Sequence, residues 1–164
     1  MNEFDKKEII ELTKKLVCYK TTASNVTELE LCASYIKDYF SSDEFSIREY
    51  VSSQKPTLII TSSGSLGPEV FLHAHFDVVP AADDQFTLIE KGVRLYGRGV
   101  LDMKGQVAAL MVLYKSLHPQ VRSKVGLIFV SDEEVGGYDG VKYLLTEKIM
   151  APEFVISAEP SDLR

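Results

Sequence analysis

The feature that most constrains the fold is a series of short, strongly apolar segments separated by stretches with helical periodicity. Residues 125–130 (VGLIFV) form an uninterrupted apolar run, which is typical of a strand covered on both faces in the middle of a sheet. Apolar runs at 57–61 (TLIIT), 70–75 (VFLHAH) and 154–157 (FVIS) predict further strands, and we expect the last to be buried as well. Strands that alternate with helices indicate an α/β domain, in three α/β/α layers, with a mostly parallel sheet.

Apolar residues recur at helical spacing between these strands. The clearest case is an apolar face made of Val107, Leu110, Met111 and Tyr114. A weaker signal at 45–51 predicts a half-exposed strand, although Glu49 stands where an apolar residue is expected. The predicted helices are 3–19, 27–40, 102–117 and 137–147, with a loop and small hairpin at 83–96 and a turn at 62–68.

Composition and charge exclude several classes of protein. The chain has 164 residues and a formal net charge of −6, which argues against binding to nucleic acid or to an anionic membrane. No apolar stretch is long enough to span a bilayer, and the charged N-terminal segment does not resemble a secretory signal. Cys18 and Cys32 form no disulfide framework and are expected to be small buried residues. A cytoplasmic protein is expected.

Acidic residues and one histidine cluster where the predicted strands end. In open α/β sheets, ligands bind at the carboxyl ends of the strands. One pair follows the strand at 70–75, another follows the strand at 125–130, one acid follows 154–157, and one begins the helix after a glycine-rich turn. In chain order these residues are His75, Asp77, Asp102, Glu133, Glu134 and Glu159.

So many acids at one sheet edge would repel one another unless a cation lay between them. A mixed set of imidazole and carboxylate ligands without thiolate suits zinc, with cobalt or manganese as alternatives. Two cations fit better than one, because a carboxylate such as Asp102 can bridge them. The residues therefore predict a two-metal hydrolytic site.

Each residue has a structural alternative when it is taken alone. His75 can be a core histidine, and His73 competes with it because both lie on one face of the strand. Asp77 can cap a turn, and Asp102 can cap the helix, a role that we expect it also to play. Glu133 and Glu134, after Asp132, can be a solvated charge run. These alternatives weaken together, because all the residues fall at corresponding ends of successive elements.

A nucleotide-binding, flavodoxin-like domain is a further alternative. It rests only on the turn Gly97-Arg98-Gly99 before a helix. That turn lacks a phosphate-binding fingerprint, and the acidic cluster would repel phosphate. The sequence favours the metal site.

Four motifs in order and spacing carry a resemblance to a known family. They are AHFDVVP at 74–80, LYGRGVLDMKG at 95–105, SDEEVGG at 131–137 and AEPS at 158–161. The chain thus resembles the di-zinc metallopeptidases and deacylases that include aminoacylase, glutamate carboxypeptidase, acetylornithine deacetylase and succinyl-diaminopimelate desuccinylase. Two departures are minor: the family often has Gly where Ala74 and Gln106 stand.

The resemblance implies a role for each matched residue. His75 and Glu159 would bind the first zinc, Glu134 the second, and Asp102 both, with a cis peptide bond between Asp102 and Met103. Asp77 would orient the imidazole of His75. Glu133 would be the general base that activates a hydroxide shared by the two metals, in the hydrolysis of an N-acyl amino acid or a short peptide.

The resemblance also implies parts that are not matched here. The family's second metal takes a further histidine from a C-terminal segment, and a lid and dimerisation domain follows the Glu159 motif. Residues 1–164 are therefore expected to be the N-terminal part of the catalytic domain, with a homodimer expected for a full-length parent. The alternative function is a catalytically silent metal-binding fragment of such an enzyme.

Overall fold

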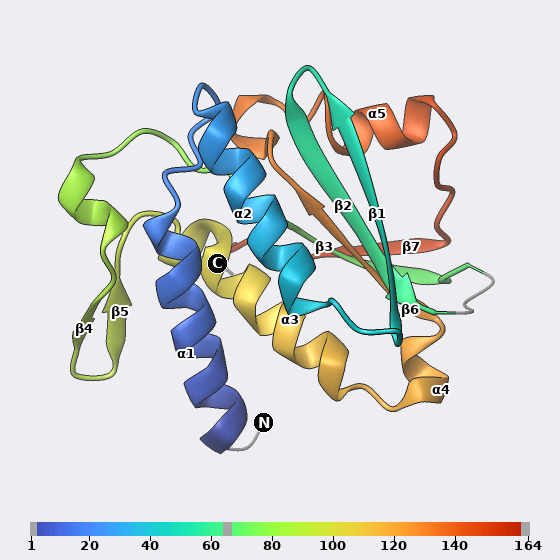
Figure 1. The fold of residues 1–164 in the computed structure, drawn as a ribbon, viewed down its shortest axis with the longest axis horizontal. Coiled ribbons are helices and arrows are strands. Elements are labelled where there is room, and N and C mark those ends of the chain that lie inside the picture. The colour runs from blue at the N-terminus through green and yellow to red at the C-terminus, as the bar shows by residue number, and fades with distance from the viewer. Residues whose placement is uncertain (1–2, 64–66, 162–164) are drawn as a thin grey trace.

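The computed structural model describes residues 3–63 and 67–161, and a five-stranded sheet organises them (Figure 1). The strand order is β1-β2-β6-β3-β7. β6 pairs in parallel with β3, and β3 pairs in parallel with β7, whereas β2 pairs antiparallel with both β1 and β6. The strands are β1 Phe45–Ser52, β2 Lys55–Ser62, β3 Val70–His75, β6 Val125–Val130 and β7 Phe154–Ser157.

Helices cover both faces of this sheet, as the α/β/α prediction requires. Strand alternation sends Leu58 and Phe129 into a large core beneath α1, α2 and α3, and sends Ile59 and Ile128 into a smaller core beneath α5. The helices are α1 Glu3–Cys18, α2 Val26–Tyr39, α3 Gly105–Ser116, α4 Pro119–Arg122 and α5 Val141–Thr146. A hairpin of β4 Ile89–Lys91 and β5 Arg94–Tyr96 follows the short helix η1 Asp83–Phe86 and lies at the edge of the molecule (Figure 1).

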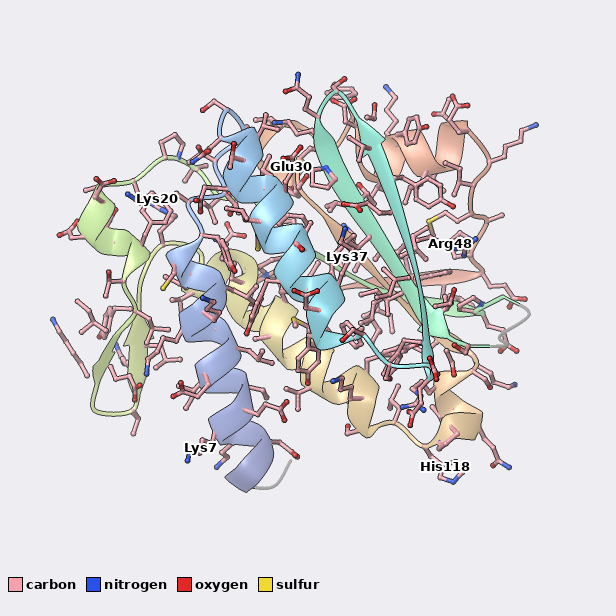
Figure 2. The ribbon with its side chains drawn as sticks, viewed as in Figure 1. Lys7, Lys20, Glu30, Lys37, Arg48 and His118 are labelled. Carbon is pink, nitrogen blue, oxygen red and sulfur yellow. The ribbon has the colours of Figure 1, made fainter. Side chains whose placement is uncertain are left out.

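The apparent mismatch at Glu49 has a simple structural reason. Glu49 lies in β1 on the same face as Phe45 and Ile47, which pack against the larger core, and its carboxylate accepts a hydrogen bond from the ammonium of Lys37 at 2.5 Å. Lys37 reaches from α2 toward β1 (Figure 2). The predicted strand at 45–51 is confirmed as β1, and at Glu49 an ion pair with Lys37 takes the place of an apolar contact.

Three predictions about the elements are wrong in detail. β7 was expected to be buried, yet Phe154, Val155 and Ile156 are 66%, 51% and 57% exposed because β7 is an edge strand that pairs with β3 alone. α3 begins at Gly105 rather than at residue 102, and α5 begins at Val141 rather than at residue 137. The turn predicted at 62–68 falls partly outside the described residues.

The cysteines divide between the surface and the core. Cys32 is buried in α2, as expected, whereas Cys18 is exposed at the end of α1, contrary to expectation. Both are free thiols. Among the described residues, none of the helices combines the length and the apolar character needed to cross a membrane.

Tyr114 provides a test of the larger core. Its side chain is fully buried in α3, and its hydroxyl donates a hydrogen bond to the carbonyl of Val125 at 2.9 Å, at the start of β6. We expect Tyr114→Phe to lower the free energy of unfolding by about 1–2 kcal/mol, because the carbonyl loses a buried donor without a change in packing. Urea denaturation measures this change, and an unchanged midpoint would contradict it.

Candidate metal centre

A buried histidine, His75, is the last residue of β3. His75 is fully buried, and its Nδ1–H donates a hydrogen bond to the backbone carbonyl of Asp77 at 3.0 Å. The Oδ1 atom of Asp77 lies 3.4 Å from the same nitrogen. Because Asp77 holds the proton on Nδ1, the other ring nitrogen, Nε2, is the one that faces the neighbouring elements.

Asp77 also fixes the turn that follows β6. Its Oδ1 accepts a hydrogen bond from the backbone N–H of Glu133 at 3.3 Å, and its Oδ2 accepts one from Glu134 at 3.0 Å. This turn is the short helix η3, Glu133–Val135, which ends at Gly136 with φ of +106°. One fully buried carboxylate thus sets the positions of both the imidazole and the two glutamates.

Asp102 reaches the site from an irregular turn rather than from a helix. It lies in η2, Val100–Lys104, a π-helical turn in which Asp102 and Met103 have non-helical backbone angles. The peptide bond between them is cis, as the resemblance led us to expect. Asp102 does not cap α3, since the N-cap position belongs to Lys104 and carries no side-chain hydrogen bond. The expected capping role is therefore wrong.

Glycine is required at the start of this turn. Gly99 has φ of +78°, and a Cβ atom there would lie 2.7 Å from a methyl carbon of Val78. Because α3 does not begin until Gly105, the Gly97-Arg98-Gly99 turn does not present a helix N-terminus to a ligand. The geometry gives no support to the nucleotide-binding alternative.

Three side chains form a compact group of potential metal ligands. Atoms of His75, Asp102 and Glu159 all lie within 4.8 Å of one another. His75 Nε2 is 3.0 Å from Asp102 Oδ1 and 3.6 Å from Glu159 Oε2. Glu133 Oε2 lies 3.8 Å from the same nitrogen. The elements β3, η2, η3 and the segment after β7 thus converge on one point.

The charges of this group perturb one another. Burial raises the pKa of Glu134, and the charge of Asp102 raises it further, which places Glu134 within electrostatic reach of the group. Burial also raises the pKa of Glu159; His75 opposes this shift, and Asp102 and Glu133 reinforce it. Carboxylates that resist ionisation at one site are stabilised by a cation.

The pKa of His75 lies far from its usual range. Burial alone would lower its pKa, but the hydrogen bond and charge of Asp77, together with the hydrogen bond to Asp102, raise the pKa to about 9. The imidazole is therefore protonated at neutral pH, and the proton on Nε2 points at the carboxylates. A cation that binds here must displace that proton.

This shift predicts how the stability of the metal-free chain depends on pH. A histidine whose folded pKa lies above its ordinary value of 6.5 stabilises the fold fully below pH 6.5 and loses this effect as pH rises toward 9. Burial lowers the pKa of Lys104 to about 8, so this residue opposes the trend above pH 8. Between pH 6.5 and 8 we expect the free energy of unfolding to fall by ~2 kcal/mol. Urea denaturation in chelator measures it, and His75→Gln should flatten the profile.

His73, the competing histidine, lies outside the ligand group. Its Nδ1 is 3.1 Å from the hydroxyl of Ser157 on β7, and its Nε2 is buried without a hydrogen-bond partner in the described part of the chain. Burial, and then the nearby His75, lower the pKa of His73 to about 4, so it is neutral.

Two charged residues near the site were not singled out from the sequence. Lys104 is fully buried, and its ammonium donates a hydrogen bond to the carbonyl of Tyr19 at 2.6 Å. This bond connects the residue after α1 to the turn that holds Asp102.

Asp132 is also buried and accepts hydrogen bonds from the backbone N–H groups of Asp139 and Gly140. The solvated-run alternative is thus wrong for Asp132. Its neighbours in the sequence are equally acidic, so no sequence signal separates it from them.

Comparison of the sequence with known proteins identifies a matching family. Residues 71–164 match peptidase family M20/M25/M40. Succinyl-diaminopimelate desuccinylase of Xanthomonas campestris pv. campestris (strain B100) is 32% identical over 161 residues, which cover 90% of this chain and 42% of the relative. The enzyme of the same name from Nautilia profundicola is 30% identical, over 93% of this chain and 42% of the relative. The chain therefore spans less than half the length of these curated relatives.

Solved structures share the fold. Human carnosine dipeptidase 1 matches 98% of this chain with a TM-score of 0.78 and 19% sequence identity, and the match covers 40% of the dipeptidase. A metallo-carboxypeptidase of the M20 family from Sulfolobus solfataricus matches 99% of this chain with a TM-score of 0.67 and 15% identity, over 38% of its own length. At these identities the likeness establishes the fold and nothing finer.

Proposed function

The chain belongs to peptidase family M20/M25/M40, and from this premise we propose that its ligand group is a two-zinc centre for amide hydrolysis. The proposed substrates are N-acyl amino acids, such as succinyl-diaminopimelate or acetylornithine, or short peptides. The names of the relatives support this range, since they include desuccinylases and a dipeptidase.

The observation that carries the proposal is the convergence of His75, Asp102 and Glu159. One imidazole nitrogen and two carboxylates within 4.8 Å offer the donor set that zinc prefers. Burial, and then the neighbouring carboxylates, raise the pKa of Glu134 and that of Glu159, and a divalent cation would stabilise the ionised forms of both. The residues present fit the metal.

We assign the ligands as follows. His75 and Glu159 would hold one zinc, Glu134 would hold the other, and Asp102 would serve both. Asp77 keeps one proton of His75 on Nδ1, so Nε2 is the nitrogen that would offer its lone pair to the metal once the proton on Nε2 is displaced. Cobalt or manganese can replace zinc in such a donor set.

The chain's own contribution to the reaction centres on Glu133. Zinc, when bound, lowers the pKa of water and polarises the substrate carbonyl. Glu133 is half-exposed, 3.8 Å from His75 Nε2, and its backbone is fixed by Asp77. Its carboxylate accepts a proton from the attacking water and then delivers that proton to the leaving amine nitrogen.

Residues 1–164 are proposed to act as the N-terminal part of such a catalytic domain, since the chain spans 42% of the length of the desuccinylases. The expected homodimer and the cytoplasmic location stay predictions. The same coverage favours a second candidate function, a metal-binding chain that is catalytically silent by itself.

Calorimetric titration with zinc, paired with a hydrolysis assay, tests the proposal. Two tight sites per chain with turnover of N-succinyl or N-acetyl amino acids, or of dipeptides, would support the hydrolase. One weak site without turnover would favour the silent metal-binding chain. The absence of any zinc binding would refute both functions.

Asp77 gives a more specific test of how the site is assembled. Asp77→Asn keeps the shape of the side chain. It puts an amide N–H₂ group in place of one carboxylate oxygen, which can then no longer accept the hydrogen bond from the backbone N–H of Glu133 or of Glu134. We expect zinc affinity to fall about 10–100-fold, as for other residues that orient a metal-binding histidine. Calorimetry at constant pH measures the change. Asp83→Asn, which removes an exposed ion pair with Lys20, is the control and should bind zinc normally.

A further inference from the structure

A cavity of about 470 Å³ lies beside the ligand group, between the end of the sheet and α5. Its wall includes Glu133, which the proposed mechanism uses, and His73, two residues before His75 on the same face of β3. The cavity therefore shares Glu133 with the proposed reaction centre. Neither the proposed zinc ligands nor the proton transfer by Glu133 requires such a space.

The interior of the cavity is suited to a short aliphatic chain. Val130 on β6 and Val141 and Leu145 on α5 give it an apolar lining. A mostly apolar cavity with a few polar groups is the usual form of a small-molecule site, and 470 Å³ lies within the usual range of volumes. His73 and Glu133 add polar side chains to this lining.

Lys142 supplies the only positive charge among the described residues that line the cavity. Its ammonium lies over the ring of Tyr138, 4.5 Å from the centroid, and no ion pair with a carboxylate is found for it in residues 3–63 and 67–161. The aromatic ring holds the ammonium without neutralising it. The ammonium of Lys142 thus gives this cavity a positive charge in a chain whose net charge is negative.

We propose that this cavity receives the acyl group of the substrate and that Lys142 selects acyl chains that end in a carboxylate. The scissile amide lies at Glu133, the methylene groups lie against Val130 and Leu145, and the terminal carboxylate pairs with Lys142. The inference rests on the proposed function for the identity of the ligand. The cavity and its charge are independent of that function.

Two small amides, used as probes, show whether binding in the cavity depends on the charge or on the shape of the acyl chain. N-methylsuccinamate carries the amide, the two methylene groups and a terminal carboxylate, whereas N-methylbutyramide has a methyl group in place of the carboxylate. Titration of the isotope-labelled chain, followed by the amide resonances of Gly136, Gly137 and Val141, reports binding in the cavity without any need for turnover. We expect N-methylsuccinamate to bind about fivefold more tightly than N-methylbutyramide. This ratio is the largest affinity gain usually found for an exposed ion pair.

Three variants complete the test. Lys142→Met should remove the fivefold preference and leave butyramide binding unchanged, whereas Leu145→Ser should weaken both probes alike. Lys91→Met is the matched control, since Lys91 also lies over a ring, that of Tyr96, on the distant β4–β5 hairpin (Figure 1). Equal binding of the two probes, persistence of the preference in Lys142→Met, or no resonance shift up to the solubility limit would overturn the inference.

Zinc titration of the same variants separates this inference from the proposed function. Zinc binding at His75 without probe binding in the cavity would refute the cavity alone. Probe binding in the cavity without zinc binding would refute the proposed function and leave a carboxylate-selective site.

Discussion

His75→Ala removes zinc binding by the chain, with a loss of affinity expected to exceed ~100-fold. His75 supplies the one nitrogen of the ligand group, and it lies 3.0 Å from Asp102 and 3.6 Å from Glu159. Substitution of a residue that only orients a metal-binding histidine costs about 10–100-fold, so loss of the ligand itself should cost more. Calorimetry, or competition with a zinc-binding dye, measures the effect.

The matched control for this variant lies two residues away. His73 shares the strand and the face with His75, but it contacts Ser157 instead of the ligand group. His73→Ala should therefore bind zinc with normal affinity. If His73→Ala lost zinc and His75→Ala kept it, the assignment of the metal-binding histidine would be reversed.

Several elements could be predicted from the sequence to within a residue because their physical causes are local. The strands β3, β6 and β7 have the predicted bounds, since an apolar run between polar turns is a local property. The meeting of His75 and Glu159 follows from the same logic, because the carboxyl ends of parallel strands share one edge of the sheet, whereas Asp102 joins them from the turn η2.

The errors arise where distant parts of the chain decide the outcome. Apolar content predicted that β7 is buried, but burial depends on which strand lies beside it, and β7 has β3 on one side only. Asp102 resembled a helix cap because the following residues are good helix formers, yet the backbone stays irregular until Gly105. The burial of Lys104 depends on the carbonyl of Tyr19, 85 residues earlier, and so leaves no local pattern.

Substitution of Glu133 by Gln is expected to lower kcat for amide hydrolysis by about 10²–10⁴-fold wherever the zinc-loaded protein turns over, while zinc affinity stays unchanged. The amide keeps the shape of the side chain and the backbone hydrogen bond to Asp77 but cannot accept a proton. Glu133 lies outside the group formed by His75, Asp102 and Glu159, so its loss leaves the metal ligands in place.

Paired measurements make this prediction specific to proton transfer. Steady-state hydrolysis of an N-acyl amino acid gives kcat, and calorimetry on the same sample gives zinc affinity. Glu30, an exposed residue on α2 (Figure 2), contributes no atom to the ligand group, so Glu30→Gln is the control and should change neither quantity. A Glu133→Gln variant with normal kcat would remove Glu133 from the mechanism. A variant that lost zinc and activity together would instead make Glu133 a ligand, because its carboxylate lies only 3.8 Å from His75 Nε2 and a shared metal could span that separation.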